Sequence, residues 1–152
     1  MRDINANIRR DQILAPVVLD GGADATNSAS VDLAGYRHVS IYALFGASGD
    51  TLSDSLRAYA ELQHSDDDST WVAVPDAQAT NTLTGANVGT FADVNSDGRA
   101  SNVYQTQYTG SRRYVRMRVN RTGTHTNGIP AAALAVRFGP IDAPVTQPTI
   151  GT

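Results

Sequence analysis

The chain has 152 residues, the size of one domain, and it contains no cysteine, so disulfides, thiolate metal sites and cysteine nucleophiles are excluded. Its net charge of -3 argues against general nucleic-acid binding, which normally needs a strongly positive surface. No apolar signal-peptide core opens the chain and no run of roughly eighteen apolar residues follows, so we expect neither secretion nor membrane insertion.

The composition favours β-strands over helices. Every basic residue is arginine and the only glutamate is Glu61, whereas Gly, Ser, Thr, Asn and Val are abundant. Because lysine and glutamate favour helix interiors and the abundant residues favour strands and turns, we expect strands joined by polar turns.

The first part of the chain predicts an edge element followed by a strand. Residues 1–20 end in an apolar stretch around Pro16, which cannot donate to a strand ladder, so we expect an edge strand or an extended arm. A short strand follows at 30–33. Residues 37–45 then alternate apolar and polar side chains, which predicts a strand that buries Val39, Ile41, Ala43 and Phe45.

The next elements predict a hairpin and a long loop. Residues 56–63 alternate with period two and 71–74 resume after a polar loop, so these two segments form a hairpin. Residues 76–102 contain few apolar anchors, and we expect a long excursion with at most one short strand.

Three strands complete the series, at 103–108, 114–121 and 130–138. In the second of them, the inward side chains are Val115, Met117 and Val119, and the side chains facing water are Arg116, Arg118 and Asn120. In the last strand, four apolar side chains share one side: Ala132, Leu134, Val136 and Phe138.

Short strands with regular turns and no helical period predict an all-β fold, an antiparallel β-sandwich of jelly-roll or Ig-like type with extended N- and C-terminal arms. We divide the chain into an N-terminal arm or edge strand (1–20), the sandwich domain (21–139) and an extended C-terminal tail (140–152) that contains Pro144 and Pro148.

Few residues suggest metal or catalytic chemistry. His38, His64 and His125 lack the spacing of a metal site, so we expect ordinary surface or interface histidines. No nucleophile elbow, inward carboxylate pair or phosphate-binding loop is present, so we predict neither enzymatic activity nor a cofactor.

Two acidic segments allow alternative interpretations. Asp93, Asn95 and Asp97 match the first half of a calcium loop, but position twelve of that pattern is Tyr104 instead of glutamate, so an Asx-rich turn is favoured over a weak cation site. The run 66–68 is interpreted as a solvated loop; the alternative is a site for a cation or for a neighbouring subunit's arginine.

Arginines are concentrated near residue 115. Side chains two residues apart on a strand point the same way, so this group predicts a surface that binds phosphate or carboxylate groups, with a solvated outer face as the alternative. The candidates are Arg112, Arg113, Arg116 and Arg118.

The segments LQHSDDDSTW (62–71) and YTGSRRYVR (108–116), with the opening MRDI and QILAP (12–16), resemble small structural proteins of tailed phages, of the capsid decoration or cement type. The resemblance implies a virion component, made in the host cytoplasm, that binds the outer surface of the major capsid protein shell and stabilises it, often as a trimer. The expected contact residues are the four arginines and the apolar residues Ile13, Leu14, Val17 and Val18.

Two alternatives stay open. One is a structural component of the tail or neck, which would have the same fold and bind a different ring. The other is a carbohydrate-binding sandwich displayed on the virion, in which aromatic side chains stack on sugars; the candidates are Tyr42, Tyr59 and Tyr114.

Overall fold

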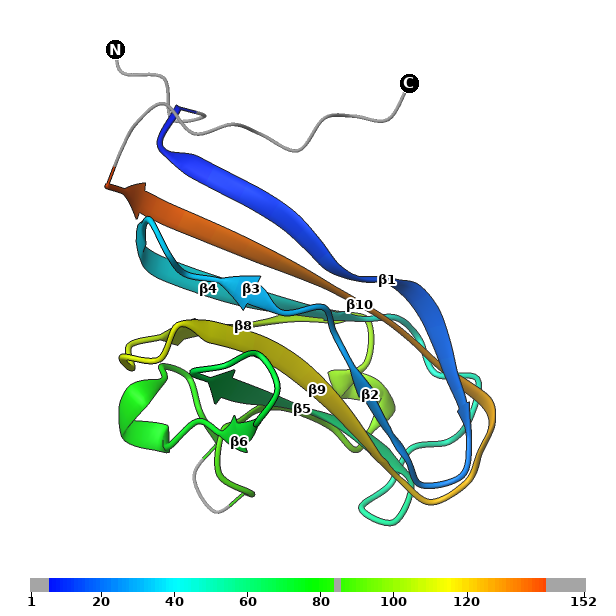
Figure 1. The fold of residues 1–152 in the computed structure, drawn as a ribbon. Helices are drawn as coiled ribbons and strands as arrows, with labels where there is room; N and C mark the ends of the chain where they lie inside the picture. The colour runs from blue at the N-terminus through cyan, green and yellow to red at the C-terminus, as the bar shows by residue number, and fades with distance from the viewer. Residues whose placement is uncertain (1–5, 84–85, 142–152) are drawn as a thin grey trace.

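Two antiparallel β-sheets packed face to face form the fold in the computed structural model, which describes residues 6–83 and 86–141 (Figure 1). All strand pairs are antiparallel. The predicted all-β antiparallel sandwich is therefore confirmed. Most of the predicted C-terminal tail, 142–152, lies outside the described residues.

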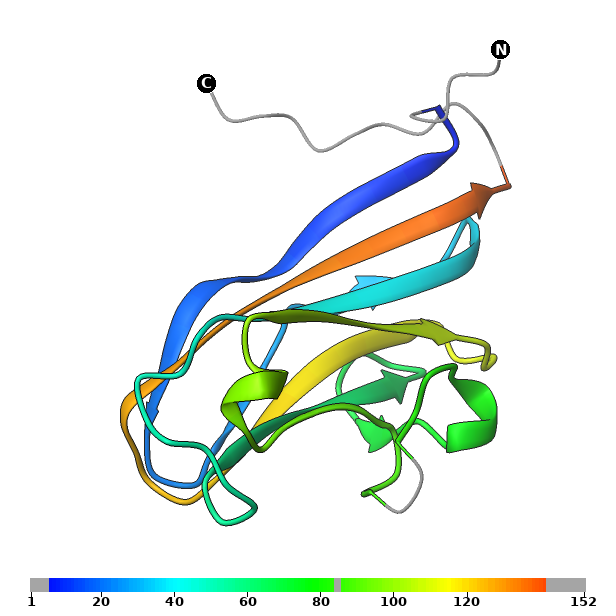
Figure 2. The same ribbon diagram turned by 180° about the vertical axis from the view of Figure 1, so that it is seen from behind.

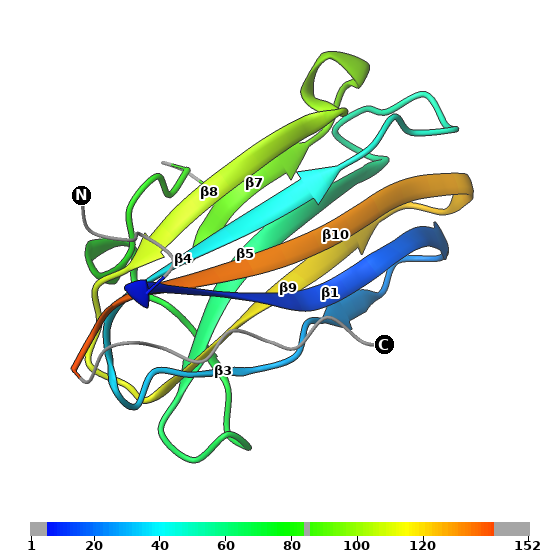
Figure 3. The ribbon, with the colours of Figure 1, turned by 90° about the horizontal axis from the view of Figure 1, so that it is seen from above.

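The first sheet has four strands, and Figure 3 looks down onto it. Its long edge strand has register shifts between Gln12 and Val17, around Pro16, as expected for a proline-containing edge. In spatial order the strands are β1 (Ile8–Gly21), β10 (His125–Pro140), β4 (Tyr36–Phe45) and β8 (Asn102–Tyr108).

The second sheet is built on two central strands, β9 (Tyr114–Thr122) and β5 (Arg57–Ser65), which pair along nine residues. Short strands complete its two sides. β9 also pairs with β2 (Ala25–Asn27) and β3 (Val31–Asp32), and β5 also pairs with β6 (Val72–Ala73) and β7 (Thr90–Val94).

The strand order identifies the sandwich as a jelly roll. The chain crosses from one sheet to the other after β1, β3, β4, β7, β8 and β9. If β2 and β3 count as one interrupted strand, the sheets read 1-10-4-8 and 2/3-9-5-7, which is the eight-stranded double Greek-key order, with β6 as an addition. Of the two sandwich types expected, the structure has the jelly roll.

In its described residues, 76–83 and 86–102, the predicted excursion holds one strand, β7, and two three-residue 3-10 turns at Asp76–Gln78 and Asp97–Arg99. It lies toward the viewer in Figure 2. Nothing helical in the described ranges reaches the length and apolar character of a membrane-spanning segment.

The core lies between the sheets, where period-two alternation places the inward side chains. β4 and β9 bury the side chains predicted from the sequence, and β5 contributes Ala58, Ala60 and Leu62. The confirmed inward residues are Val39, Ile41, Ala43, Phe45, Val115, Met117 and Val119.

β10 turns its small side chains inward. Ala131, Ala133 and Ala135 are at most 3% exposed. The side chains predicted to share one side of this strand do share it, and that side is the outer one, where they are half-buried: Ala132, Leu134, Val136 and Phe138. Since Ala133 lies opposite Ala43 in the register, this part of the interior has room only for methyl groups.

This orientation predicts unequal effects of the same substitution at neighbouring positions. We expect Ala133→Leu to destabilise the protein by about 1–3 kcal/mol, because a buried methyl group has no space to grow. Ala132→Leu, on the outer side, should change stability by less than about 0.5 kcal/mol. Urea unfolding of both variants measures the difference, and equal destabilisation would contradict the orientation of β10.

Candidate functional site

Arg112 and Arg113 lie in the turn between β8 and β9, at one end of the sandwich. With Arg37 at the start of β4 they line a cleft of about 690 Å³. Arg113 is already engaged, because its Nε and Nη2 donate to the two carboxylate oxygens of Asp32 at 2.9 and 2.7 Å. This pair lowers the pKa of Asp32. Arg112 makes only a 3.5 Å contact with the exposed Asp66.

Arg37 is exposed, and none of the ion pairs among the described residues involves it. The cleft therefore offers Arg37 and Arg112 to an incoming anionic group. A guanidinium matches a carboxylate or phosphate in a two-bond geometry, so anion binding at this end of the sandwich stays a prediction, with Arg112 from the predicted group and Arg37 as its residues.

Arg116 and Arg118 lie elsewhere, on the outer face of the second sheet. Arg116 Nε donates to Gln63 Oε1 at 2.9 Å, and its guanidinium lies 4.3 Å from the Trp71 ring centroid. Arg118 is opposite Glu61 on the neighbouring strand. The four arginines expected to act together are thus divided between two surfaces.

A buried tyrosine fixes the turn that carries Arg112. The backbone N–H of Arg112 donates to Tyr108 Oη at 2.9 Å, and Tyr108 Oη lies 2.9 Å from His64 Nδ1. Burial, followed by the nearby Arg112 charge, lowers the pKa of His64 and favours the neutral ring. The tautomer of this neutral ring sets the direction of its hydrogen bond with the Tyr108 hydroxyl.

Two of the three histidines are buried, against the expectation of surface side chains. His64 is 4% exposed and His125 is 1% exposed. His64 has the same parity along β5 as buried Leu62, which was the available signal. His38 is exposed and stacks on Phe138 with ring centroids 5.1 Å apart.

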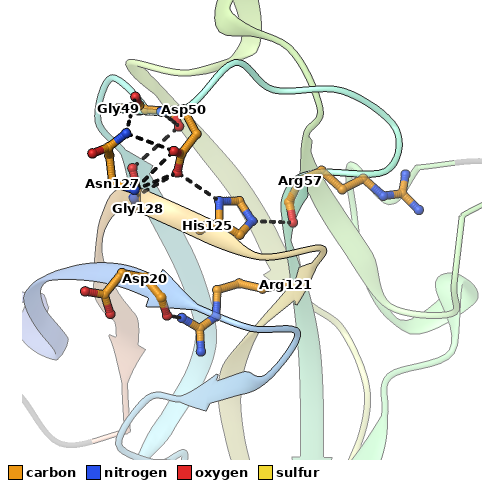
Figure 4. Close-up of polar contacts among 9 residues, drawn as sticks. Asp20, Gly49, Asp50, Arg57, Arg121, His125, Asn127 and Gly128 are labelled. Atoms are coloured by element: carbon orange, nitrogen blue, oxygen red, sulfur yellow. Dashed lines mark hydrogen bonds and ion pairs between the residues drawn. The ribbon is translucent and has the colours of Figure 1, made fainter.

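His125 belongs to a polar cluster that connects β10 to the loop that follows β4 (Figure 4). The Asp50 carboxylate accepts from the backbone N–H groups of Asn127 and Gly128 at 3.0–3.1 Å. Burial alone would raise the pKa of Asp50, but these hydrogen bonds outweigh it and keep the pKa below its ordinary value.

The cluster pairs His125 with Asp50, yet it lacks the access that a catalytic base needs. His125 Nδ1 is 4.0 Å from Asp50 Oδ2, and its Nε2 is 3.3 Å from the Arg57 carbonyl oxygen. The side chain is fully buried, so no substrate proton can reach either nitrogen. The pair connects loop to strand. Nearby, Arg121 on β9 connects the two sheets, because its Nη1 donates to the Asp20 carbonyl on β1 (Figure 4).

The apolar residues predicted as contacts on β1 differ in accessibility. Ile13 is 5% exposed and belongs to the core, and Leu14 is half-buried against it. Val17 and Val18 are exposed. Only these two valines are therefore available to a partner.

Val18 begins an apolar row that crosses the outer face of the first sheet. Val18 on β1 lies opposite Pro130 on β10. The next outward residue of β10 is Ala132, which lies opposite Leu44 on β4. Leu44 in turn lies opposite Val103 on β8. Val18, Leu44 and Val103 are 53%, 39% and 63% exposed. The sequence did not reveal this row, because its members become neighbours only through the register. We call these five residues the apolar row.

The acidic candidates have other partners. Asp93 Oδ2 accepts from Arg57 Nη1 at 2.9 Å, and Asn95 Nδ2 donates to Asp54 Oδ1 at 2.7 Å. Asp97 begins a 3-10 turn. Across residues 6–83 and 86–141, no group of three or more His, Asp or Glu side chains is placed to hold a metal ion.

The run 66–68 forms the tip of a hairpin loop. Asp67 accepts hydrogen bonds from the backbone N–H groups of Ser69 and Thr70 and from the Ser65 hydroxyl. These bonds hold the pKa of Asp67 well below its usual range, with the Thr70 and Ser69 N–H groups contributing most. The acidic motif therefore shapes the turn.

No protein-family model matches the chain, and no curated protein matches it. Among solved structures it is similar to the PBSX exported protein XepA, with 18% identity and a TM-score of 0.50 over 100% of this chain and 44% of that one. It also matches the SPBc2 prophage-derived protein YomS (12% identity, TM-score 0.38, 84% and 94% of the two chains) and a chain of Bacillus endospore appendages (10%, 0.40, 88% and 88%).

The chain spans less than half of the length of XepA. At this level of identity, the likeness to XepA shows a common β fold, and no role of an XepA residue is transferred to this chain.

The buried His64 predicts a pH dependence of stability. Because folding lowers the pKa of His64, its protonation favours the unfolded chain. Its contribution is complete above the ordinary pKa of 6.5 and is lost as the pH falls below that value. We expect the melting temperature to fall between about pH 7.5 and 5.5, and to fall less in His64→Gln. Equal pH dependence of the melting temperature in the unchanged protein and His64→Gln would contradict this role of His64.

Proposed function

We propose that this protein is a structural component of a phage virion and, within that class, a capsid decoration protein that binds the outer surface of the major capsid protein shell. Its function is contact and not catalysis. The sequence segments 62–71 and 108–116 support the class, and the jelly-roll fold is one that viral capsid proteins use.

The observation that carries the proposal is the apolar row. Exposed apolar side chains on a small protein are usually scattered, whereas here they are aligned across all four strands of one sheet. Half-buried Leu134, Val136 and Phe138 continue the apolar character along β10. A flat sheet face of this kind suits a protein partner better than a small substrate.

The Arg37 and Arg112 cleft adds a polar contact. Carboxylates on the capsid protein or on a second copy of this chain pair there with arginines that lack strong internal partners. Val17 and Val18 on the edge strand β1 extend the contact toward neighbouring subunits. We favour a homotrimer, since small assembly proteins commonly associate symmetrically.

Copy number in purified virions tests the placement. A decoration protein on a capsid lattice should be present in hundreds of copies per particle and should remain on heads that have lost their tails. Quantitative mass spectrometry of intact and tail-free particles gives both values. A handful of copies, lost with the tails, would instead favour the tail or neck component.

A matched pair of variants tests the surface. Val103→Asp places a charge in the apolar row and should lower binding to undecorated capsids about tenfold or more. Val88→Asp, at another exposed valine that lies outside the row, should bind as the unchanged protein does. Co-sedimentation with capsids measures both, and equal binding by the two variants would exclude the row as the contact surface.

A further inference from the structure

The outer face of the second sheet contains a concentration of buried polar atoms without hydrogen-bond partners. Seven such atoms occur among the described residues, and five are on this face. Buried polar groups are nearly always paired, so a cluster of unpaired ones calls for a missing partner. The five atoms are Arg57 Nε, Thr90 Oγ1, Asp93 Oδ1, Arg118 Nε and Asn120 Nδ2.

The register gathers these atoms around one aromatic side chain. Tyr59 on β5 lies opposite Asn120 on β9 and opposite Asp93 on β7. Thr90 lies opposite Glu61, which is two residues after Tyr59 on β5. Tyr59 is half-buried, so part of its ring remains accessible.

A cleft of about 380 Å³ opens over this part of the sheet, lined by Arg57, Tyr59, Thr90, Asp93 and Arg99 among others. Its volume lies within the range of roughly 300–1,000 Å³ found for small-molecule sites. Thr90 is only 2% exposed, yet it lines the cleft and its hydroxyl has no partner.

The types of unpaired atom restrict the ligand. Three are nitrogen donors, Asp93 Oδ1 is an acceptor, and the Thr90 hydroxyl can do either. An anion would satisfy the donors alone and a cation the acceptors alone, whereas a ligand hydroxyl both donates and accepts. A sugar presents several hydroxyls together with an apolar ring face that can lie against an aromatic side chain.

The central ion pair of the cleft is internally compensated, because Arg57 Nη1 donates to Asp93 Oδ2 at 2.9 Å. Arg99 Nη1 donates to the uncharged Asp93 backbone carbonyl at 3.2 Å, so Arg99 keeps its positive charge. The Asp93 carboxylate beside the unpaired atoms repels an anion and accepts from a ligand hydroxyl, which favours a neutral hydroxyl-bearing ligand at this point of the cleft.

We propose that the cleft around Tyr59 binds a neutral carbohydrate. Tyr59 supplies the stacking surface, and Arg57, Thr90 and Asp93, which line the cleft, supply hydrogen bonds to sugar hydroxyls. Of the three tyrosines considered from the sequence, only Tyr59 lines this cleft. Tyr114 does not line it, and Tyr42 lies on the first sheet. Both Tyr59 and Tyr114 have an arginine over the ring, Arg57 at 5.6 Å and Arg113 at 5.1 Å from the respective ring centroid. The proposal does not rest on a role in the capsid.

The test uses the full chain, an array of neutral oligosaccharides, and a second array of acidic ones. Hits are followed by calorimetric titration of four proteins: the unchanged chain, Tyr59→Ala, Thr90→Val and the control Tyr42→Ala. Thr90→Val is nearly isosteric and removes a hydroxyl without a partner, so it should fold with unchanged or higher melting temperature.

We expect hits among the neutral sugars. Affinity should fall about tenfold in Tyr59→Ala through lost stacking, and about two- to tenfold in Thr90→Val through one lost hydrogen bond. Tyr42→Ala should retain the affinity of the unchanged chain. Three outcomes would each overturn the proposal: no hits among the neutral sugars, hits confined to acidic sugars, or equal affinity in Thr90→Val and the unchanged chain. These outcomes are independent of the copy number in virions, which tests the capsid proposal.

Discussion

The space between the two sheets governs the surface as well as the core. The central strands place several methyl groups in it among the larger core side chains, from Ala43 on β4, Ala58 and Ala60 on β5, and Ala133 and Ala135 on β10. Since adjacent residues of a strand face opposite ways, burying the alanines of β10 forces its larger apolar neighbours outward. The close approach of the sheets thereby creates the apolar outer side of the first sheet.

The strands could be predicted because their alternation is local, and every predicted strand has a counterpart in the structure. Alternation could not orient β10, where both faces are apolar and only the packing partner decides. Alternation also could not show that the last strand begins at His125. The start of this strand is held by the loop that contains Asp50, which lies about 75 positions earlier in the sequence. Ile13 was assigned to a contact surface because the stretch around it is apolar on both faces. The register places Gln12 opposite the outward Leu134, so its neighbour Ile13 points inward.

The candidate surfaces were harder to predict than the strands, because they consist of pairs distant in sequence. Arg113 is neutralised by Asp32, 81 residues before it, so the run of arginines overstates the charge available to a partner. The apolar row joins residues from four strands, and the cleft around Tyr59 joins β5 and β7. Sequence reasoning could name candidate residue types, whereas the register decides which of them lie on one surface.

The two outer faces have opposite chemical character and point in opposite directions (Figure 1). The first sheet presents the apolar row and the second presents half-buried polar side chains around Tyr59. A protein that docks on a shell through the first sheet leaves the second sheet directed away from the shell, where soluble or cell-surface glycans can reach it. The jelly roll keeps the two proposed contact surfaces apart because its inner faces are filled and each sheet has only one face left for a partner.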